Sequence, residues 1–129
     1  MKLRAKDVLE RYKREDLPEF AEISVLEVNT KGNFGSYPIH VAAVRGDIEE
    51  LQALIDGGAD VNAPGEMGNR PLHEAAIQGN VEAARLLIQN GARADARNAD
   101  GQTAEAMALL LGKTEVVAVL SPNIRGSLH

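Results

Sequence analysis

The chain has 129 residues, of which 44% are hydrophobic and 26% are charged, a composition that suits one globular domain. It contains no cysteine, which excludes a disulfide framework, a thiolate nucleophile and a cysteine-based zinc site. A net charge of −5 disfavours nucleic-acid binding, and no apolar run reaches the roughly 20 residues of a membrane span, so we expect a cytoplasmic protein that binds neither nucleic acid nor membranes.

A period of 33 residues organises the chain. Gly35, Gly68 and Gly101 are separated by this interval, and so are His40 and His73. Self-similarity at a fixed period indicates stacked structural repeats that share one continuous core. We therefore expect one domain of about four units: a divergent N-terminal capping repeat over 1–31, full repeats over 32–63 and 64–96, a C-terminal capping repeat over 97–120 and a tail over 121–129.

The N-terminal unit is the least regular. We predict two helices in it, over residues 5–13 and 16–21, and Pro18 shortens the second at its N-terminal end. Val28-Asn29-Thr30 lies 33 residues before Val61-Asn62-Ala63, which places this segment in register with the units that follow.

Each of the two full repeats is predicted to contain a pair of helices. Pro38 and Pro71 suit the first turn of the first helix, because that position needs no backbone N–H donor. Gly46 and Gly79 suit the left-handed conformation that ends this helix. Apolar residues at three- and four-residue spacing then predict the second helices, over 48–55 and 81–88.

The C-terminal unit departs from this pattern. Ala104-Glu105-Ala106 stands where the full repeats have proline, an apolar residue and histidine, which suits a terminal unit on which nothing stacks. Thr103 offers a helix-capping hydroxyl, whereas Tyr37 and Arg70 occupy this position in the full repeats and predict weaker caps.

The motifs Pro71-Leu72-His73 and Gly58-Ala59-Asp60-Val61-Asn62-Ala63 resemble those of the ankyrin repeat family, whose pattern includes P-L-H-x-A-A and G-A-D-V-N-A. The resemblance covers about residues 32–120. It implies an all-α solenoid of stacked helix–turn–helix units joined by short β-hairpin loops. It also implies that His40 and His73 tie loops together by hydrogen bonds.

The family binds partners on a concave surface made of the hairpin tips and the exposed side of each first helix, so the resemblance implies a site for another protein. Its tips would include Phe34 and Met67, and its helices would present an apolar ladder of Val44, Ile77 and Leu110. An exposed apolar stripe with a polar rim is typical of an interaction surface, although hairpins folded over it would bury it. The predicted partner-binding residues are Phe34, Ser36, Val44, Arg45, Glu66, Met67, Asn69, Arg70, Ile77, Gln78, Asp100, Gln102, Leu110 and Leu111.

No catalytic constellation accompanies this surface. His73-Glu74 begins like a zinc-protease H-E-x-x-H helix, but Ile77 stands in place of the second histidine. Asn98–Gly101 fails as a calcium loop, because Ala96 and Met107 would take positions that need acidic ligands. Phosphate-binding glycine motifs and a G-x-S-x-G serine are also absent. We expect no enzymatic activity, no cofactor and no metal.

We therefore expect a monomeric, non-catalytic protein–protein interaction module, similar to the small free-standing ankyrin repeat proteins common in bacteria. One alternative is a dedicated inhibitor, such as an immunity or antitoxin-like protein. Its binding surface for a basic toxin or enzyme would be residues 32–63, which contain five acidic residues and one basic residue, Arg45. A solvent-exposed helix face is the simpler interpretation of this charge. Another alternative is a self-assembling structural protein that closes the apolar ladder in a homodimer.

Overall fold

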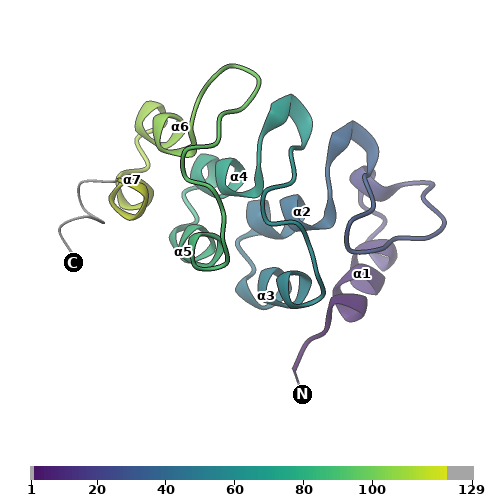
Figure 1. Ribbon diagram of the computed structural model, residues 1–129. Helices are drawn as coiled ribbons and strands as arrows, with labels where there is room; N and C mark the ends of the chain where they lie inside the picture. The colour runs from purple at the N-terminus through teal and green to yellow at the C-terminus, as the bar shows by residue number, and fades with distance from the viewer. Residues whose placement is uncertain (1, 122–129) are drawn as a thin grey trace.

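The computed structural model describes residues 2–121 and shows helices arranged in two rows (Figure 1). The inner row consists of α2 (Pro38–Arg45), α4 (Pro71–Gln78) and α6 (Ala104–Leu110). The outer row consists of α1 (Ala5–Arg14), α3 (Ile48–Asp56), α5 (Val81–Gln89) and α7 (Thr114–Leu120). Hairpin loops project from the inner row, and no strand is present within residues 2–121. The predicted all-α repeat solenoid is therefore confirmed.

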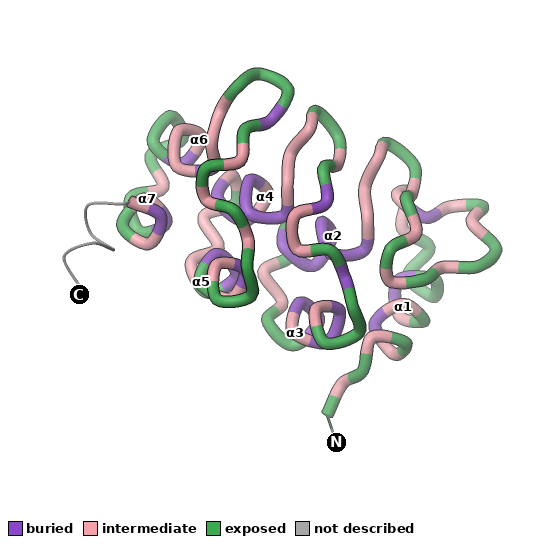
Figure 2. The backbone as a smooth tube through the Cα atoms, in the orientation of Figure 1, coloured by how far each residue is buried: buried purple, intermediate pink, exposed green. Residues whose placement is uncertain are grey.

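The core lies between the two rows. Small residues on the inner helices, such as Ala42 and Ala75, are fully buried and allow neighbouring inner helices to approach closely. Leu51 and Leu87 belong to the same core from the outer row. Burial is therefore concentrated on α2 and α4, whereas the hairpin tips are exposed (Figure 2). None of the described helices is long and apolar enough to cross a membrane.

The ends of the inner helices follow the sequence signals. Pro38 and Pro71 are the first residues of α2 and α4. Gly46 and Gly79 end these helices in the left-handed conformation, with φ of 66° and 73°, which glycine adopts without a steric penalty. Both predictions are confirmed, and the chain turns at each glycine towards its outer helix.

His40 joins the first full repeat to the hairpin of the next. Its Nδ1 accepts a hydrogen bond from the Tyr37 N–H at 3.0 Å, whereas the Tyr37 side chain itself makes no capping hydrogen bond. Its Nε2–H donates to the carbonyl oxygens of Ala63 and Asn69, at 2.9 and 3.1 Å. His73 makes the equivalent bonds one unit later, with Arg70 N–H at 3.0 Å and Gln102 O at 2.9 Å. The linking role implied for the two histidines is confirmed.

Acidification should destabilise the protein through these two histidines. Burial holds the pKa of both rings below the ordinary value of 6.5, although backbone hydrogen bonds act in the opposite direction. Because the folded pKa lies below the unfolded one, the neutral rings contribute stability that is present above pH 6.5 and is lost as the pH falls through the folded pKa. We expect urea denaturation to show a free energy of unfolding that decreases as the pH falls below 6.5. The double variant His40→Gln, His73→Gln should show a shallower decrease, and an unchanged slope would contradict this assignment.

The N-terminal unit differs from the prediction. The helix α1 begins at the expected residue, but it packs against α3 in the outer row, which is the place of a second helix. Residues 16–21 do not form the predicted helix; they contain a short 3₁₀ turn, Pro18–Phe20, between Asp16 and Glu22 at φ of 53° and 67°. The ring of Phe20 stacks on Tyr12 with centroids 6.1 Å apart. This segment is therefore held against α1 by an aromatic contact and does not form a helix of its own.

Asparagine side chains bridge successive units along the loops. The Asn29 amide donates to the carbonyl of Gly58 at 3.0 Å, and its oxygen accepts from the Asp60 N–H at 3.0 Å. Asn62 repeats this pattern one unit later, with Gly91 O at 3.1 Å and Arg93 N–H at 2.8 Å. The predicted register between residues 28–30 and 61–63 is confirmed.

The C-terminal unit keeps the helix pair. Thr103 Oγ1 accepts a hydrogen bond from the Ala106 N–H at 3.1 Å, so this unit has the predicted hydroxyl cap. Leu110 and Leu111 are exposed at the end of α6. The tail predicted over 121–129 lies outside the described residues, apart from Ser121.

Candidate functional site

The tips of the first two hairpins present large apolar side chains to solvent. Phe34 and Met67 are 64% and 58% exposed. Their backbones are left-handed, with φ of 65° and 59°, a conformation that is uncommon for bulky residues. The carbonyl oxygens of Ser36 and Asn69 accept the backbone hydrogen bonds that close the two tips, at 2.6 and 2.8 Å. Strained backbone of this kind is often found at binding sites.

The apolar ladder on the inner helices is exposed at both ends. Val44 is 38% exposed and Leu110 is 72% exposed, whereas Ile77 between them is half-buried. The hairpins therefore leave Val44 and Leu110 accessible. Ile77 is the one member of the ladder whose side chain is partly covered.

A groove of about 350 Å³ lies between the first two hairpins and the inner helices. It brings together residues from the N-terminal unit and the two full repeats, because hairpins and inner helices of successive repeats lie side by side (Figure 1). Six of the predicted partner-binding residues line it: Ser36, Val44, Arg45, Glu66, Met67 and Asn69. The other predicted residues do not line it: Phe34, Arg70, Ile77, Gln78, Asp100, Gln102, Leu110 and Leu111.

The groove also contains residues that were not predicted from the sequence. Leu17 and Glu19 reach it from the N-terminal loop, and His40 forms part of its wall. Val41 and Glu74 occupy equivalent positions on α2 and α4. Each lies three residues before a member of the apolar ladder, and residues at this spacing share one face of a helix. This spacing could have predicted that Val41 and Glu74 lie in the groove.

A family model described as ankyrin repeats, with three copies of the repeat, matches residues 12–98 and, in an overlapping match, residues 39–127. The chain belongs to the ankyrin repeat family. Ankyrin repeats are generally protein–protein interaction modules, and the family is typically non-catalytic. No curated protein matches the chain.

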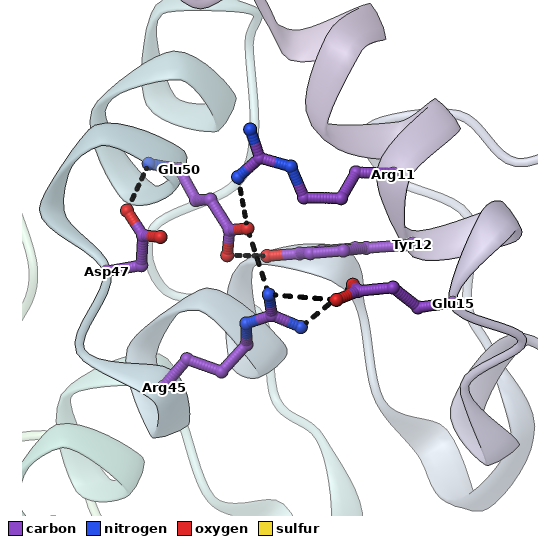
Figure 3. Close-up of polar contacts among 6 residues, drawn as sticks. All are labelled: Arg11, Tyr12, Glu15, Arg45, Asp47 and Glu50. Carbon is purple, nitrogen blue, oxygen red and sulfur yellow. Dashed lines mark hydrogen bonds and ion pairs between the residues drawn. The ribbon is translucent and has the colours of Figure 1, made fainter.

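In this ankyrin repeat protein, Arg45 belongs to a polar cluster centred on the buried Glu50 and does not form a free rim (Figure 3). Glu50 is fully buried and accepts hydrogen bonds from Arg11 at 2.8 Å, from the Tyr12 hydroxyl at 2.8 Å and from Arg45 at 3.2 Å. Arg45 also pairs with Glu15 at 3.0 Å, and its guanidinium lies 5.2 Å from the centroid of the Tyr12 ring. The cluster attaches α1 to α2 and α3, and it fixes Arg45 beside the groove.

The remaining charges of the groove are negative. Glu19, Glu66 and Glu74 line it, and none of the three forms an ion pair with any residue between 2 and 121. Burial raises the pKa of Glu74, and the Glu66 carboxylate adds to this effect, whereas the Asn69 side chain lowers the pKa. A positive charge placed in the groove would therefore find unpaired carboxylates.

Other predicted residues of this ankyrin repeat protein have structural partners or lie apart. The Arg70 guanidinium donates to the carbonyl of Asn62 at 2.7 Å, which ties the side chain to the end of the preceding unit. The Gln102 carbonyl accepts the hydrogen bond of His73. Asp100 lies on the third hairpin, and Gln78 is exposed at the end of α4.

Proposed function

We propose that this ankyrin repeat protein is a non-catalytic interaction module that binds another protein on its concave surface, formed by the hairpin tips and the exposed side of the inner helices. The supporting observation is the exposure of apolar side chains there, since exposed patches with polar rims are typical of interaction sites. We place the protein in the cytoplasm as a monomer. Five of the predicted binding residues are exposed large apolar side chains: Phe34, Val44, Met67, Leu110 and Leu111.

Capture from a lysate of the source organism tests this proposal. The double variant Ile77→Arg, Met67→Ser should lose a protein that the wild type retains, because it places a charge in the ladder and removes an apolar tip. A matched control, Ile48→Arg with Val25→Ser, changes exposed apolar residues of an outer helix and the N-terminal loop. It should capture as the wild type does. Equal capture by all three proteins would place the site elsewhere.

Replacing Met67 by glycine should separate binding from folding. Glycine adopts the left-handed backbone at this tip without strain, so the free energy of unfolding should stay constant or rise by up to about 1 kcal/mol. Loss of an exposed anchor should weaken partner binding by roughly tenfold or more. Chemical denaturation and titration of the captured partner measure the two effects. A destabilised but fully binding Met67→Gly variant would show that this methionine serves the fold instead.

The second candidate function is inhibition of a basic protein, and the unpaired carboxylates of the groove favour it. An inhibitor predicts one partner held much more tightly than micromolar affinity, whereas an adaptor predicts several micromolar partners. Titration of each captured protein distinguishes them. A mass that increases with concentration in sedimentation would instead favour the self-assembling alternative.

A further inference from the structure

The groove between the first two hairpins combines apolar and acidic side chains in a way that restricts its occupant. Leu17, Val41, Val44 and Met67 supply apolar lining. At about 350 Å³ the groove lies at the small end of ligand-binding cavities, so it has room for one or two side chains and not for a folded domain. An inserted side chain therefore needs an aliphatic part to contact this lining.

The charges of the groove favour a cationic head group on that side chain. Its acidic members, Glu19, Glu66 and Glu74, come from three different segments: the N-terminal loop, the second hairpin and α4. Arg45, the lining residue with the opposite charge, is already engaged by Glu15 and Glu50. The groove therefore keeps an excess of negative charge.

A metal ion is not the cation that this arrangement suits. Within residues 2–121 no three acidic or histidine side chains lie close enough together to hold a metal ion. Carboxylates spread along an apolar groove suit a longer group, in which a charged end and an apolar stem are separated. Lysine and arginine have this construction, and they place their stems along apolar surface while the head groups meet carboxylates.

We infer that this acidic groove receives a lysine or arginine side chain, next to an aliphatic residue, from an extended segment of the partner protein. The inference rests on the proposed function and specifies the chemistry of the partner at one part of the concave surface. Glu74 and Glu66 bind the cationic head group, and Val44 contacts the stem. The half-buried position of Glu74 strengthens the interaction, because charges attract more strongly where water is partly excluded.

A displayed library of random linear peptides tests the inference without knowledge of the natural partner. Selection against the wild-type protein should enrich peptides that carry arginine or lysine beside an aliphatic residue. Enrichment of peptides without a basic residue, or no enrichment at all, would overturn the inference.

A matched pair of variants then locates the binding. Glu66→Gln with Glu74→Gln removes two charges from the groove, whereas Glu49→Gln with Glu115→Gln removes two from exposed positions on the outer helices. The groove variant should bind a selected peptide about tenfold or more weakly, because it loses charge-assisted hydrogen bonds, and the control should bind normally. Citrulline in place of the peptide's arginine should cause a similar loss. Equal binding by the two variants would overturn the inference.

The two proposals fail in distinguishable ways. If selected peptides ignore the groove charges but are lost in the Ile77→Arg, Met67→Ser variant, the concave surface still binds and only the basic occupant is wrong. If basic peptides bind outside the groove and lysate capture does not depend on Ile77 and Met67, both proposals are wrong. Circular dichroism of each variant confirms that it is folded.

Discussion

Replacing Glu50 by alanine should lower the free energy of unfolding by about 3 kcal/mol, a large part of the stability of a domain of this size. Glu50 is the buried acceptor for Arg11, Tyr12 and Arg45. Its removal leaves a buried tyrosine hydroxyl without a partner, leaves Arg11 without its counter-charge, and leaves Arg45 with Glu15 as its remaining counter-charge. The side chains of Arg11 and Arg45 are 34% and 32% exposed, so they can recover some hydration, and the expected cost lies at the low end of that for a broken buried ion pair.

The neighbouring Glu49 supplies the control. It is exposed on the same helix, and Glu49→Ala should change the free energy of unfolding by less than about 0.5 kcal/mol. Urea denaturation of both variants measures the difference. Hydrogen exchange of Glu50→Ala should show the greatest loss of protection in α1, because the cluster joins α1 to the other units (Figure 3). A Glu50→Ala variant as stable as Glu49→Ala would contradict the assigned role.

Replacing His40 by alanine should cost a similar amount, about 3 kcal/mol, because two backbone groups are left without a partner and the Asn69 carbonyl keeps only its bond from the Gly65 N–H. The Tyr37 N–H and the carbonyls of Ala63 and Asn69 all lose the ring. The imidazole of His40 is closely packed against Gly65, because a Cβ atom added to this glycine would lie only 2.7 Å from the His40 Nε2. The variant therefore creates a cavity in addition to the unpaired groups.

His73 provides a graded comparison for His40. It bonds two backbone groups where His40 bonds three, so His73→Ala should destabilise by a smaller amount, about 2 kcal/mol. Urea denaturation at pH 8, where both rings are neutral, measures the difference without the effect of protonation. A larger decrease in the free energy of unfolding for His73→Ala than for His40→Ala would contradict the larger structural role assigned to His40.

The candidate site was only partly predictable from the sequence. The repeat register placed Phe34 and Met67 together at the tips and Val44 on the exposed side of α2, and the structure leaves all three exposed. Leu17 and Glu19 gave no such signal, because their position in the groove depends on how the N-terminal loop folds. Arg45 was predicted to bind a partner, but its pairing with Glu15, just after α1, and with Glu50 of α3 could not be inferred from a local pattern.

The amino-acid sequence alone determined the helices of the repeats and their stacking order. Proline and glycine restrict the backbone locally, and a fixed period repeats the same core contacts, so Pro38, Gly46 and their equivalents define units without reference to distant residues. Only the tertiary structure decided the N-terminal unit, the Glu50 cluster and the acidic groove. These depend on contacts such as Arg11 to Glu50, 39 residues apart, whose energies come from burial and charge pairing between elements and leave no periodic trace in the chain.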